Sequence, residues 1–399
     1  QGALILPIPK DDSLYILLSV KDTTFKEGGG FYIRVPFLYQ TKINMNKNGG
    51  KGEVIEKHKI VRTDRFNFGQ ITATRHANGR DWWILMHRCV KDVGSNIRLR
   101  FLLTSDSLSY VGEQAIGKKS PFALGQAVFS PNGCRYATFN TVSPEDFNYL
   151  DIFTFDRKTG LLSDPIQITF KDSAFAGSIA ISPNNRFLYV ATPIHLYQYD
   201  LEASDIEASK ARIADYDGFV DEFDDLLATT FYSMQLAPDN KIYMCATNSV
   251  SYFHVINNPN EKGIACNFVQ HSLKLPHLNS FSIPNFPNFR LGAQVGESCA
   301  EMIAISEIVE NNKIDLLVFP NPAQDEVTLH YNLNHQLLTT PLYWVLCDLR
   351  GNEIYKIPVN MNETNQTIHT SEFASNLYLC KLQTATGKVL VTKKLNIIR

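Results

Sequence analysis

Short apolar stretches separated by turn residues recur along the first three quarters of the chain. Three of them have nearly the same sequence, each an apolar strand that runs into a proline turn and back: residues 125–136, 177–189 and 232–243. Their prolines stand at positions 131, 183 and 238, so the repeat steps are 52 and 55 residues. Because Pro presets the first turn position and Asn or Asp tolerates the left-handed position that follows, each segment is expected to form a β-hairpin.

Both strands of each hairpin are apolar on both faces, which is typical of strands packed between neighbouring sheets. A third, aromatic-rich strand follows each time, at 151–156, 195–200 and 251–256, and a polar fourth strand comes after it. A repeat of about 40 to 50 residues built of strands is the signature of a WD40-like β-propeller blade. We therefore expect an all-β chain in which residues 1–291 form a β-propeller of five to six blades.

Two details of this region carry further expectations. Trp82 and Trp83 fall on opposite faces of one strand, as expected for a blade that packs against a neighbouring blade on each side. The chain starts at Gln1, without an initiating Met or a charged and apolar leader, and residues 3–8 already have the pattern of a strand. We expect a fragment cut inside a domain, so that the propeller is N-terminally incomplete and has an open seam or an unpaired edge.

The pattern changes after Leu291. Residues 292–313 are polar and loosely organised, and we expect them to form a linker. Seven short strands are expected in residues 314–399, at 314–319, 326–332, 342–349, 353–358, 366–369, 376–383 and 389–397. Pro320 and Pro322 end the first of these strands. Seven short strands in 86 residues predict an immunoglobulin-like β-sandwich as a second domain.

Composition and charge narrow the classes of function. Apolar residues make up 44% of the chain and charged residues 20%, as in an ordinary globular protein. The 38 basic and 40 acidic side chains give a net charge of −2, and no basic stripe favours nucleic acid as a partner. No apolar run approaches the roughly 18 residues of a transmembrane segment.

The seven cysteines stand far apart, and none is part of a CxxC motif, so neither a zinc site nor a redox pair is expected. Cys266 with Cys299 is the one disulfide that we consider. Most of the other cysteines are expected to be buried free thiols that pack as small apolar side chains.

The tail carries a family resemblance. Its features, in chain order, are Phe319-Pro-Asn-Pro322, the strand and turn at 347–354, the strand at 377–382 and a terminal hairpin with Lys393-Lys394. In this order they resemble a type A C-terminal sorting domain of the type IX secretion system of Gram-negative bacteria. The motif residues are Pro320, Asn321, Pro322, Gly351, Lys393 and Lys394. Asn376 stands where the family usually has Gly, and Asn also tolerates a positive φ.

The resemblance implies a route and partners for the chain. Such a domain is an export address that the outer-membrane translocon recognises after passage through the periplasm, and it is often removed or replaced by surface lipopolysaccharide. The chain is then expected to be secreted or held at the outer cell surface. The N-terminal part, including the stretches 76–83 and 284–292, is similar to secreted propeller proteins that carry such a tail, and this similarity implies an architecture without an established reaction.

Two groups of residues are candidate sites. His76, Arg80 and Asp81 beside Trp82 could line a carbohydrate pocket, since sugars stack on indole rings; the alternative is a hydrogen-bonded turn over core aromatics. Asp215, Asp217 and Asp221 lie in the densest acidic run and could bind Ca²⁺ through oxygen ligands; the alternative is a solvated loop, because the Glu at the twelfth position of a calcium loop is absent.

Motifs of catalysis are absent: the sequence has no HExxH, no GxSxG, no Walker loop and no repeated Asp-box. No cofactor is expected. Whether the chain is an enzyme stays open at this point, and the sequence favours a role other than catalysis. The favoured function is an exported recognition module, and the alternative is a secreted hydrolase active on glycans at the mouth of the propeller channel. A mouth lined by aromatics, amides and small residues favours binding, and a cluster of carboxylates or histidines favours hydrolysis.

Overall fold

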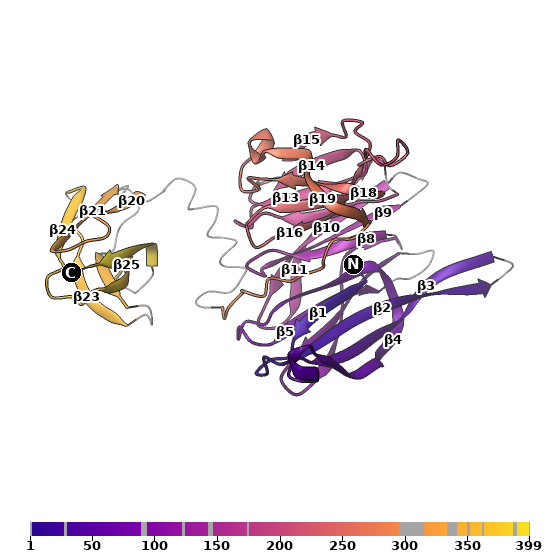
Figure 1. The fold of residues 1–399 in the computed structure, drawn as a ribbon, viewed down its shortest axis with the longest axis horizontal. Coiled ribbons are helices and arrows are strands. Elements are labelled where there is room, and N and C mark those ends of the chain that lie inside the picture. The colour runs from indigo at the N-terminus through magenta and orange to yellow at the C-terminus, as the bar shows by residue number, and fades with distance from the viewer. Residues whose placement is uncertain are drawn as a thin grey trace. The chain divides into compact units, whose positions relative to one another are not determined.

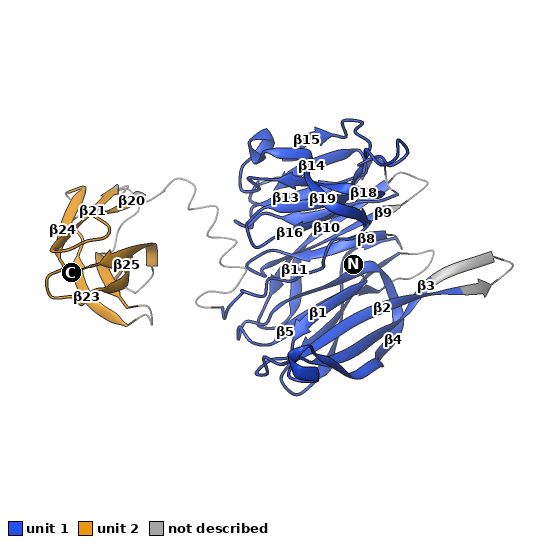
Figure 2. Cartoon of the chain, in the orientation of Figure 1, with its two compact units in different colours: residues 1–304 blue, residues 305–399 orange. Residues whose placement is uncertain are grey.

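The computed structural model describes residues 2–27, 30–88, 94–121, 124–142, 147–173, 175–294, 315–332, 341–348, 352–360, 363–385 and 389–398. These residues form strands and turns, with two short 3-10 helices at Asn48–Gly50 (η1) and Gly263–Cys266 (η2). The chain divides into two compact units, residues 1–304 and 305–399 (Figure 2). In the described part of the chain no helix is both long and apolar enough to cross a membrane.

The first seven strands form one antiparallel sheet in chain order: β1 (Ala3–Pro7), β2 (Leu14–Glu27), β3 (Gly30–Asn44), β4 (Glu53–Arg75), β5 (Trp82–Arg88), β6 (Ser95–Leu103) and β7 (Leu108–Ser120). The long strand β4 changes partner part-way along. It pairs with β3 up to Phe66, and with β5 from Phe66 to Arg75. The sheet is therefore two four-stranded units that share β4.

Three more four-stranded units follow (Figure 1). They are β8 (Leu124–Phe129), β9 (Arg135–Val142), β10 (Phe147–Asp156) and β11 (Leu161–Lys171); β12 (Ser178–Ile181), β13 (Phe187–Ala191), β14 (His195–Asp200) and β15 (Ala211–Asp215); and β16 (Phe231–Leu236), β17 (Ile242–Ala246), β18 (Ser249–Ile256) and β19 (Phe268–Ser280). The three similar sequence segments form the first hairpin of each unit. This arrangement is the β-propeller that the repeat predicts, with one unit per blade.

The turns of these three hairpins share a backbone feature. Gly133, Asn185 and Asn240 stand at equivalent positions, and their φ angles are all positive, at 75°, 67° and 65°. Gly adopts this left-handed conformation freely and Asn tolerates it better than other residues do. The left-handed turn position predicted from the sequence is thus confirmed.

Apolar cores lie between successive blades. Trp82 packs in the core between the first and second units and Trp83 in the core between the second and third, so the two rings are held on opposite faces of β5 as predicted. Two further cores join the third unit to the fourth and the fourth to the fifth. Among the described residues no such core joins the fifth unit back to the first, and we call this boundary the seam.

The segment that follows β19 runs along this seam. We call residues 281–294 the strap. The side-chain amide of Asn285 donates to the backbone oxygens of Ala3, at 3.0 Å, and Ile71, at 2.9 Å, and that of Asn288 donates to Pro131, at 2.8 Å. The strap therefore follows the inner strands β1, β4 and β8 from one end of the propeller to the other.

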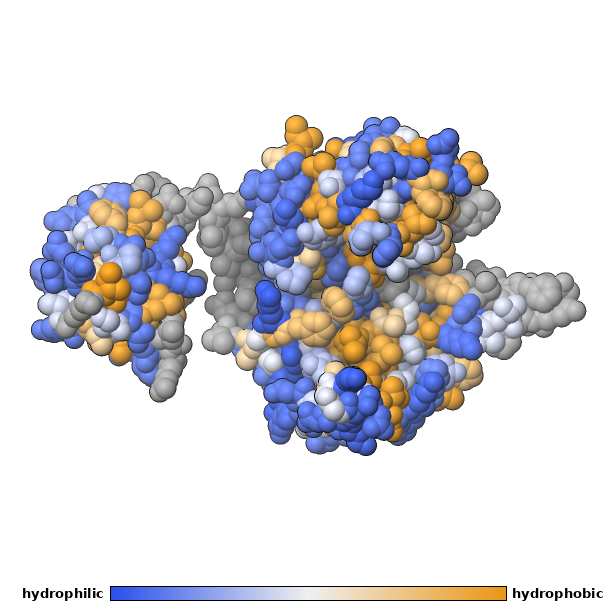
Figure 3. All heavy atoms as spheres, viewed as in Figure 1, coloured by the Kyte–Doolittle hydropathy of each residue, from blue (hydrophilic) through white to orange (hydrophobic). Residues whose placement is uncertain are grey.

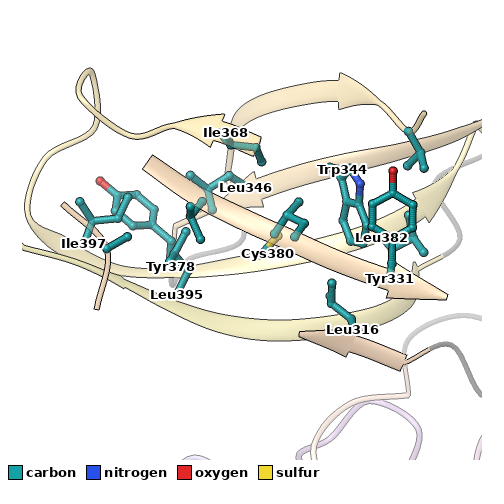
Figure 4. Close-up of a cluster of buried hydrophobic side chains, with 14 of the residues drawn as sticks. Leu316, Tyr331, Trp344, Leu346, Ile368, Tyr378, Cys380, Leu382, Leu395 and Ile397 are labelled. Atoms are coloured by element: carbon teal, nitrogen blue, oxygen red, sulfur yellow. The ribbon is translucent and has the colours of Figure 1, made fainter. Parts of the chain in front are cut away.

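The C-terminal unit is a β-sandwich. One sheet has the order β20 (Asp315–Phe319), β21 (Glu326–Asn332) and β24 (Asn365–His369); the other has β23 (Glu353–Pro358), β22 (Leu342–Cys347), β25 (Asn376–Thr384) and β26 (Val389–Ile397). Tyr331 and Trp344 pack with Leu316, Leu382 and their neighbours between the sheets (Figure 4). The sandwich predicted from seven short strands is confirmed.

Candidate functional site at the centre of the propeller

A pocket of ≈ 340 Å³ lies where the inner strands meet the strap. It is lined by Gly2 and Ala3 at the start of β1, Gln126 on β8, Tyr232 and Ser233 on β16, and strap residues 281–285. Figure 3 shows an apolar patch near the middle of this side of the propeller, with mixed apolar and hydrophilic surface around it. The pocket thus sits at the seam, where one blade-to-blade core is missing.

Two amide side chains hold the walls of the pocket in place. Gln126 is buried; its Nε2 donates to the backbone oxygen of Met234, at 2.9 Å, and its Oε1 accepts from the backbone N–H of Ile179, at 3.2 Å. This side chain therefore ties β8 to β16 and β12. Asn285 ties the strap to β1 and β4 in the same way. Because buried backbone groups need partners, these contacts fix the shape of the pocket before any ligand arrives.

The groups left open to a ligand are uncharged. The hydroxyls of Tyr232 and Ser233 make no hydrogen bond with any described residue, and the ring of Phe281 is 52% exposed. Burial raises the pKa of Tyr232, so its hydroxyl stays protonated and can donate. No Asp, Glu, His, Lys or Arg is among the lining residues. The pocket can stack an apolar ring face and hydrogen-bond hydroxyls, and its lining holds no carboxylate, imidazole, amine or guanidinium group.

The second candidate functional region is the tail motif. Pro320, Asn321 and Pro322 are exposed at the end of β20, and both prolines follow cis peptide bonds. The side chain of Asn321 donates from Nδ2 to the backbone oxygen of Lys394, and its Oδ1 accepts from the N–H of Asn396, both at 2.9 Å. Asn321 thus fastens the proline motif to β26, the strand that carries the exposed Lys393 and Lys394. Gly351 lies outside the described residues.

Comparison with known families identifies this second region. Residues 317–398 match the family described as the secretion system C-terminal sorting domain. The tail is therefore similar to a sorting domain over residues 317–398. This domain implies export through the type IX secretion system to the cell surface or the medium, as the motifs in the tail predicted.

The search of curated proteins finds no match to the chain. Solved structures are similar at low identity. An α-L-arabinofuranosidase from Fusarium graminearum is 13% identical, with 93% of each chain covered and a TM-score of 0.39. A functionally unknown protein from Desulfotomaculum acetoxidans is 14% identical over 70% of this chain and 88% of the other, with a TM-score of 0.35. A β-1,3-galactosidase of the GH43 group is 7% identical over 61% and 84%, also with a TM-score of 0.35.

The turn at residues 76–82 brings some of its predicted site residues together. Arg80 holds both oxygens of Asp81, with Nε to Oδ1 at 2.9 Å and Nη2 to Oδ2 at 3.1 Å, and this pairing lowers the pKa of Asp81. His76 lies with its ring centroid 5.7 Å from that of Trp83. Trp82 is fully buried, with the guanidinium of Arg75 3.8 Å above its ring. A sugar has no open face of Trp82 to stack on in this arrangement, and ligand binding at the turn stays a prediction.

The acidic run uses its carboxylates to fasten a loop. Asp215 pairs with Arg212, and Asp217 lies 2.9 Å from Nε2 of His271. Asp221 accepts from the backbone N–H of Ser251, at 2.6 Å, and from its hydroxyl, at 2.7 Å. The three predicted metal ligands thus turn to three different partners. In the part of the chain that is described, no three Asp, Glu, His or Cys side chains gather in a way that could hold a metal ion.

One ionisable pair was not recognised in the sequence. Asp172 follows β11, and its carboxylate accepts from Nδ1 of His195 at 2.7 Å, from the hydroxyl of Tyr197 at 2.8 Å and from that of Thr192 at 3.0 Å. Burial opposes ionisation of Asp172, but these donors outweigh it and its pKa is lowered. The pair was missed because Asp172 and His195 are 23 positions apart in the sequence and belong to two successive blades, which come together only in the fold. Neither residue lines the central pocket.

The cysteines correct one expectation. Cys266 is a buried free thiol, so the pairing of Cys266 with Cys299 is wrong. Its environment explains this, because Cys266 packs in the core between the fourth and fifth blades. Cys245, Cys347 and Cys380 are buried free thiols as predicted. Cys134 is disulfide-bonded and is not one of the free thiols.

Proposed function

We propose that this chain is an exported recognition module that binds an uncharged, ring-shaped ligand, such as the end of a neutral glycan, in the central pocket of its propeller. The tail is its export signal, recognised by the outer-membrane translocon. Delivery by this route places the propeller at the outer cell surface or in the medium, where glycans are available as ligands.

One observation carries the proposal: the open side chains of the pocket are two aromatic rings and several hydroxyls, without a charged group. Rings stack on the apolar faces of a sugar, and hydroxyls exchange hydrogen bonds with its edges. The volume of ≈ 340 Å³ is at the lower end of the range of about 300–1,000 Å³ found for small-molecule sites. An uncharged ligand of the size of one or two sugar units fits these properties.

The alternative is a hydrolase acting on glycans at the same place. Glycoside hydrolysis generally requires two carboxyl groups about 5–10 Å apart across the scissile bond. The pocket lining has none, and the pairs Asp172–His195 and Asp217–His271 are not part of it. The lining therefore favours binding without turnover.

The test is binding of the full chain to a glycan array, with hydrolysis of every bound glycan measured in parallel. For the best ligand, Tyr232→Phe removes one hydroxyl and should weaken binding by about 1 kcal/mol, or about fivefold, in calorimetry. Tyr243→Phe is the matched control, because the hydroxyl of Tyr243 donates to Asp239 at 2.8 Å, away from the pocket. Equal affinity of both variants would remove the pocket from the proposal, and release of sugar would replace it with the hydrolase.

A further inference from the structure

Phe281, the first residue of the strap, has a backbone conformation that is unusual for its residue type. Its φ angle is 56°, in the left-handed region. Most of the described non-glycine residues with a positive φ are Asn, Asp or His, which adopt this region more readily; Phe281 and Lys10 are the exceptions. For a bulky side chain the conformation is strained, because Cβ comes close to the following carbonyl oxygen.

The chain on either side of Phe281 holds this conformation in place. Before it, β19 stays paired with β18 up to Ser280. After it, the backbone N–H of Ser282 donates back to Oδ1 of Asn279, at 3.3 Å, and Asn285 ties the strap to β1 and β4. Strained residues persist only where the surrounding structure fixes them in this way, and they are frequent at ligand sites.

Packing in the free protein does not account for this strain. Phe281 is 52% exposed and belongs to none of the apolar cores between blades. Its ring stacks on no ring of another described residue, whereas Phe289 of the same strap lies with its ring centroid 5.8 Å from that of Trp82. What Phe281 does contribute to is the lining of the central pocket.

We propose that Phe281 selects the class of ligand in the central pocket, because its ring is held ready to stack on a ligand ring with an unbroken face of C–H groups, such as a pyranose. The proposal rests on the function proposed above and adds the residue that selects the ligand. Tyr232 and Ser233 then supply hydroxyls from β16 to the edge of the ligand. The strap is fastened to the same strand, since Nε2 of Gln235 donates to the backbone oxygen of Phe286 at 3.2 Å. A pre-ordered stacking surface of this kind loses little freedom when the ligand binds.

The binding experiment uses the methyl β-pyranosides of glucose, galactose and mannose together with the corresponding open-chain alditols. All are uncharged and carry hydroxyls, but only the pyranosides have a ring to stack. In titrations followed by ligand-observed NMR, the full-length wild type should bind its preferred pyranoside about tenfold more tightly than the alditol. Phe281→Ala should bind that pyranoside about tenfold more weakly than the wild type and should lose the preference for a ring, whereas Phe281→Trp should keep it.

Phe286→Ala is the matched control. Phe286 lies on the same strap and is 49% exposed, but it is not part of the pocket lining. This variant should therefore keep both the affinity of the wild type and its preference for a ring.

Melting temperatures test the strain without any ligand. At an ordinary backbone position Gly is less stable than Ala, but at a left-handed position Gly alone is free of strain. In the propeller transition, Phe281→Gly should melt about 2 °C above Phe281→Ala. Phe286→Gly should not melt above Phe286→Ala, because Phe286 is not among the residues with a positive φ.

Loss of the ring preference in Phe281→Ala, together with this order of melting temperatures, supports the proposal. A Phe281→Ala variant that keeps the preference, or a Phe281→Gly variant no more stable than Phe281→Ala, overturns it. If Tyr232→Phe weakens binding and Phe281→Ala does not, the pocket stays the ligand site and only the role of Phe281 is lost. If the wild type binds none of the pyranosides, the proposed function fails and the role of Phe281 fails with it.

Discussion

The propeller and the sorting domain bury their strands in different ways. In β13, all five residues are buried: Leu188 and Val190 pack against the preceding blade, and Phe187, Tyr189 and Ala191 against the following one. In β25, buried and more exposed residues alternate, with Tyr378, Cys380 and Leu382 facing the core and the residues between them facing outward. The strands of a blade need neighbours on both sides, whereas each sheet of the sandwich needs only one.

This difference has a consequence for cooperativity. A propeller blade shares every core with another blade, so damage to one core spreads along the ring. The sandwich keeps its core, from Leu316 to Ile397, within its own strands. The two units should therefore unfold as two independent transitions, and a change in one should leave the other in place.

The largest effect is expected from Trp344→Ala. Trp344 is 1% exposed and packs on Tyr331 with ring centroids 5.3 Å apart, so its truncation leaves a cavity in the sandwich core (Figure 4). The loss should be about 3–5 kcal/mol, which is much of the stability of a domain of this size. Calorimetry of the full chain should show the tail transition move to low temperature or vanish while the propeller transition stays.

Trp82→Ala is the matched change in the propeller, since Trp82 is also fully buried. It should shift only the propeller transition. If either substitution moves both transitions together, the two units are coupled and the contrast between them is wrong.

The next largest effect is a difference between the two units in how their stability responds to acid. His254 is buried among Phe231 and Phe268; its Nδ1 accepts from the N–H of His271, and burial lowers its pKa to about 4. An unfolded His takes up a proton near pH 6.5, so between about pH 6.5 and 4 the unfolded propeller binds a proton that the folded one does not. The free energy of unfolding of the propeller should therefore decrease as the pH is lowered through this window. His254 accounts for about 3 kcal/mol of that decrease.

Thermal melts at several pH values between 7 and 4 check this. Burial also lowers the pKa of His87, so both groups act in the same direction in the propeller. In the described part of the tail, His330 and His369 are not buried, and its transition should move less over the window. His254→Phe should flatten part of the pH dependence, and a propeller as insensitive to acid as the tail would contradict the assignment.

The parts of the structure that could be predicted from the sequence are those that depend on residues close together in the chain. The proline turns, the paired tryptophans and the seven strands of the tail each depend on residues close together in the chain. The sharing of β4 between two blades was not legible, because the change of partner at Phe66 depends on the blades on either side. The repeat also gave no sign that the strap would follow the inner strands.

The central pocket was beyond the sequence for a similar reason. Its walls come from residues 2–3, 126, 232–233 and 281–285, which only the arrangement of the blades and the strap in space brings together. Phe281 has no neighbouring motif to mark it, and Tyr232 is marked only as the first residue of a structural repeat, whereas Trp82 drew attention and proved to be a core residue. Residues that are close in the sequence therefore suggested a binding site at the turn of residues 76–82. Residues that are close only in the fold form the pocket at the seam.

The smallest expected effect comes from substitutions in two turns of the propeller. They distinguish the energy of backbone strain from the energy of a hydrogen bond between blades. Asn185 and Asn240 both have a positive φ, but only the side chain of Asn185 is seen to reach the turn of the preceding blade, where its Oδ1 accepts from the N–H of Asn132 at 2.8 Å. Gly keeps this φ without strain, so Asn240→Gly should be nearly neutral, while Asn185→Gly should lose about 1 kcal/mol for the hydrogen bond.

Replacement by Ala adds the cost of a left-handed residue, about 1–2 kcal/mol, at both positions. Denaturant unfolding of the four variants gives the two contributions separately. The difference between the Gly variants measures what one turn-to-turn contact adds to the propeller, and the tail, whose turns serve one sandwich alone, has no counterpart to it among the described residues. Equal losses for Asn185→Gly and Asn240→Gly would mean that the blades are held together by their apolar cores and that the turns add nothing.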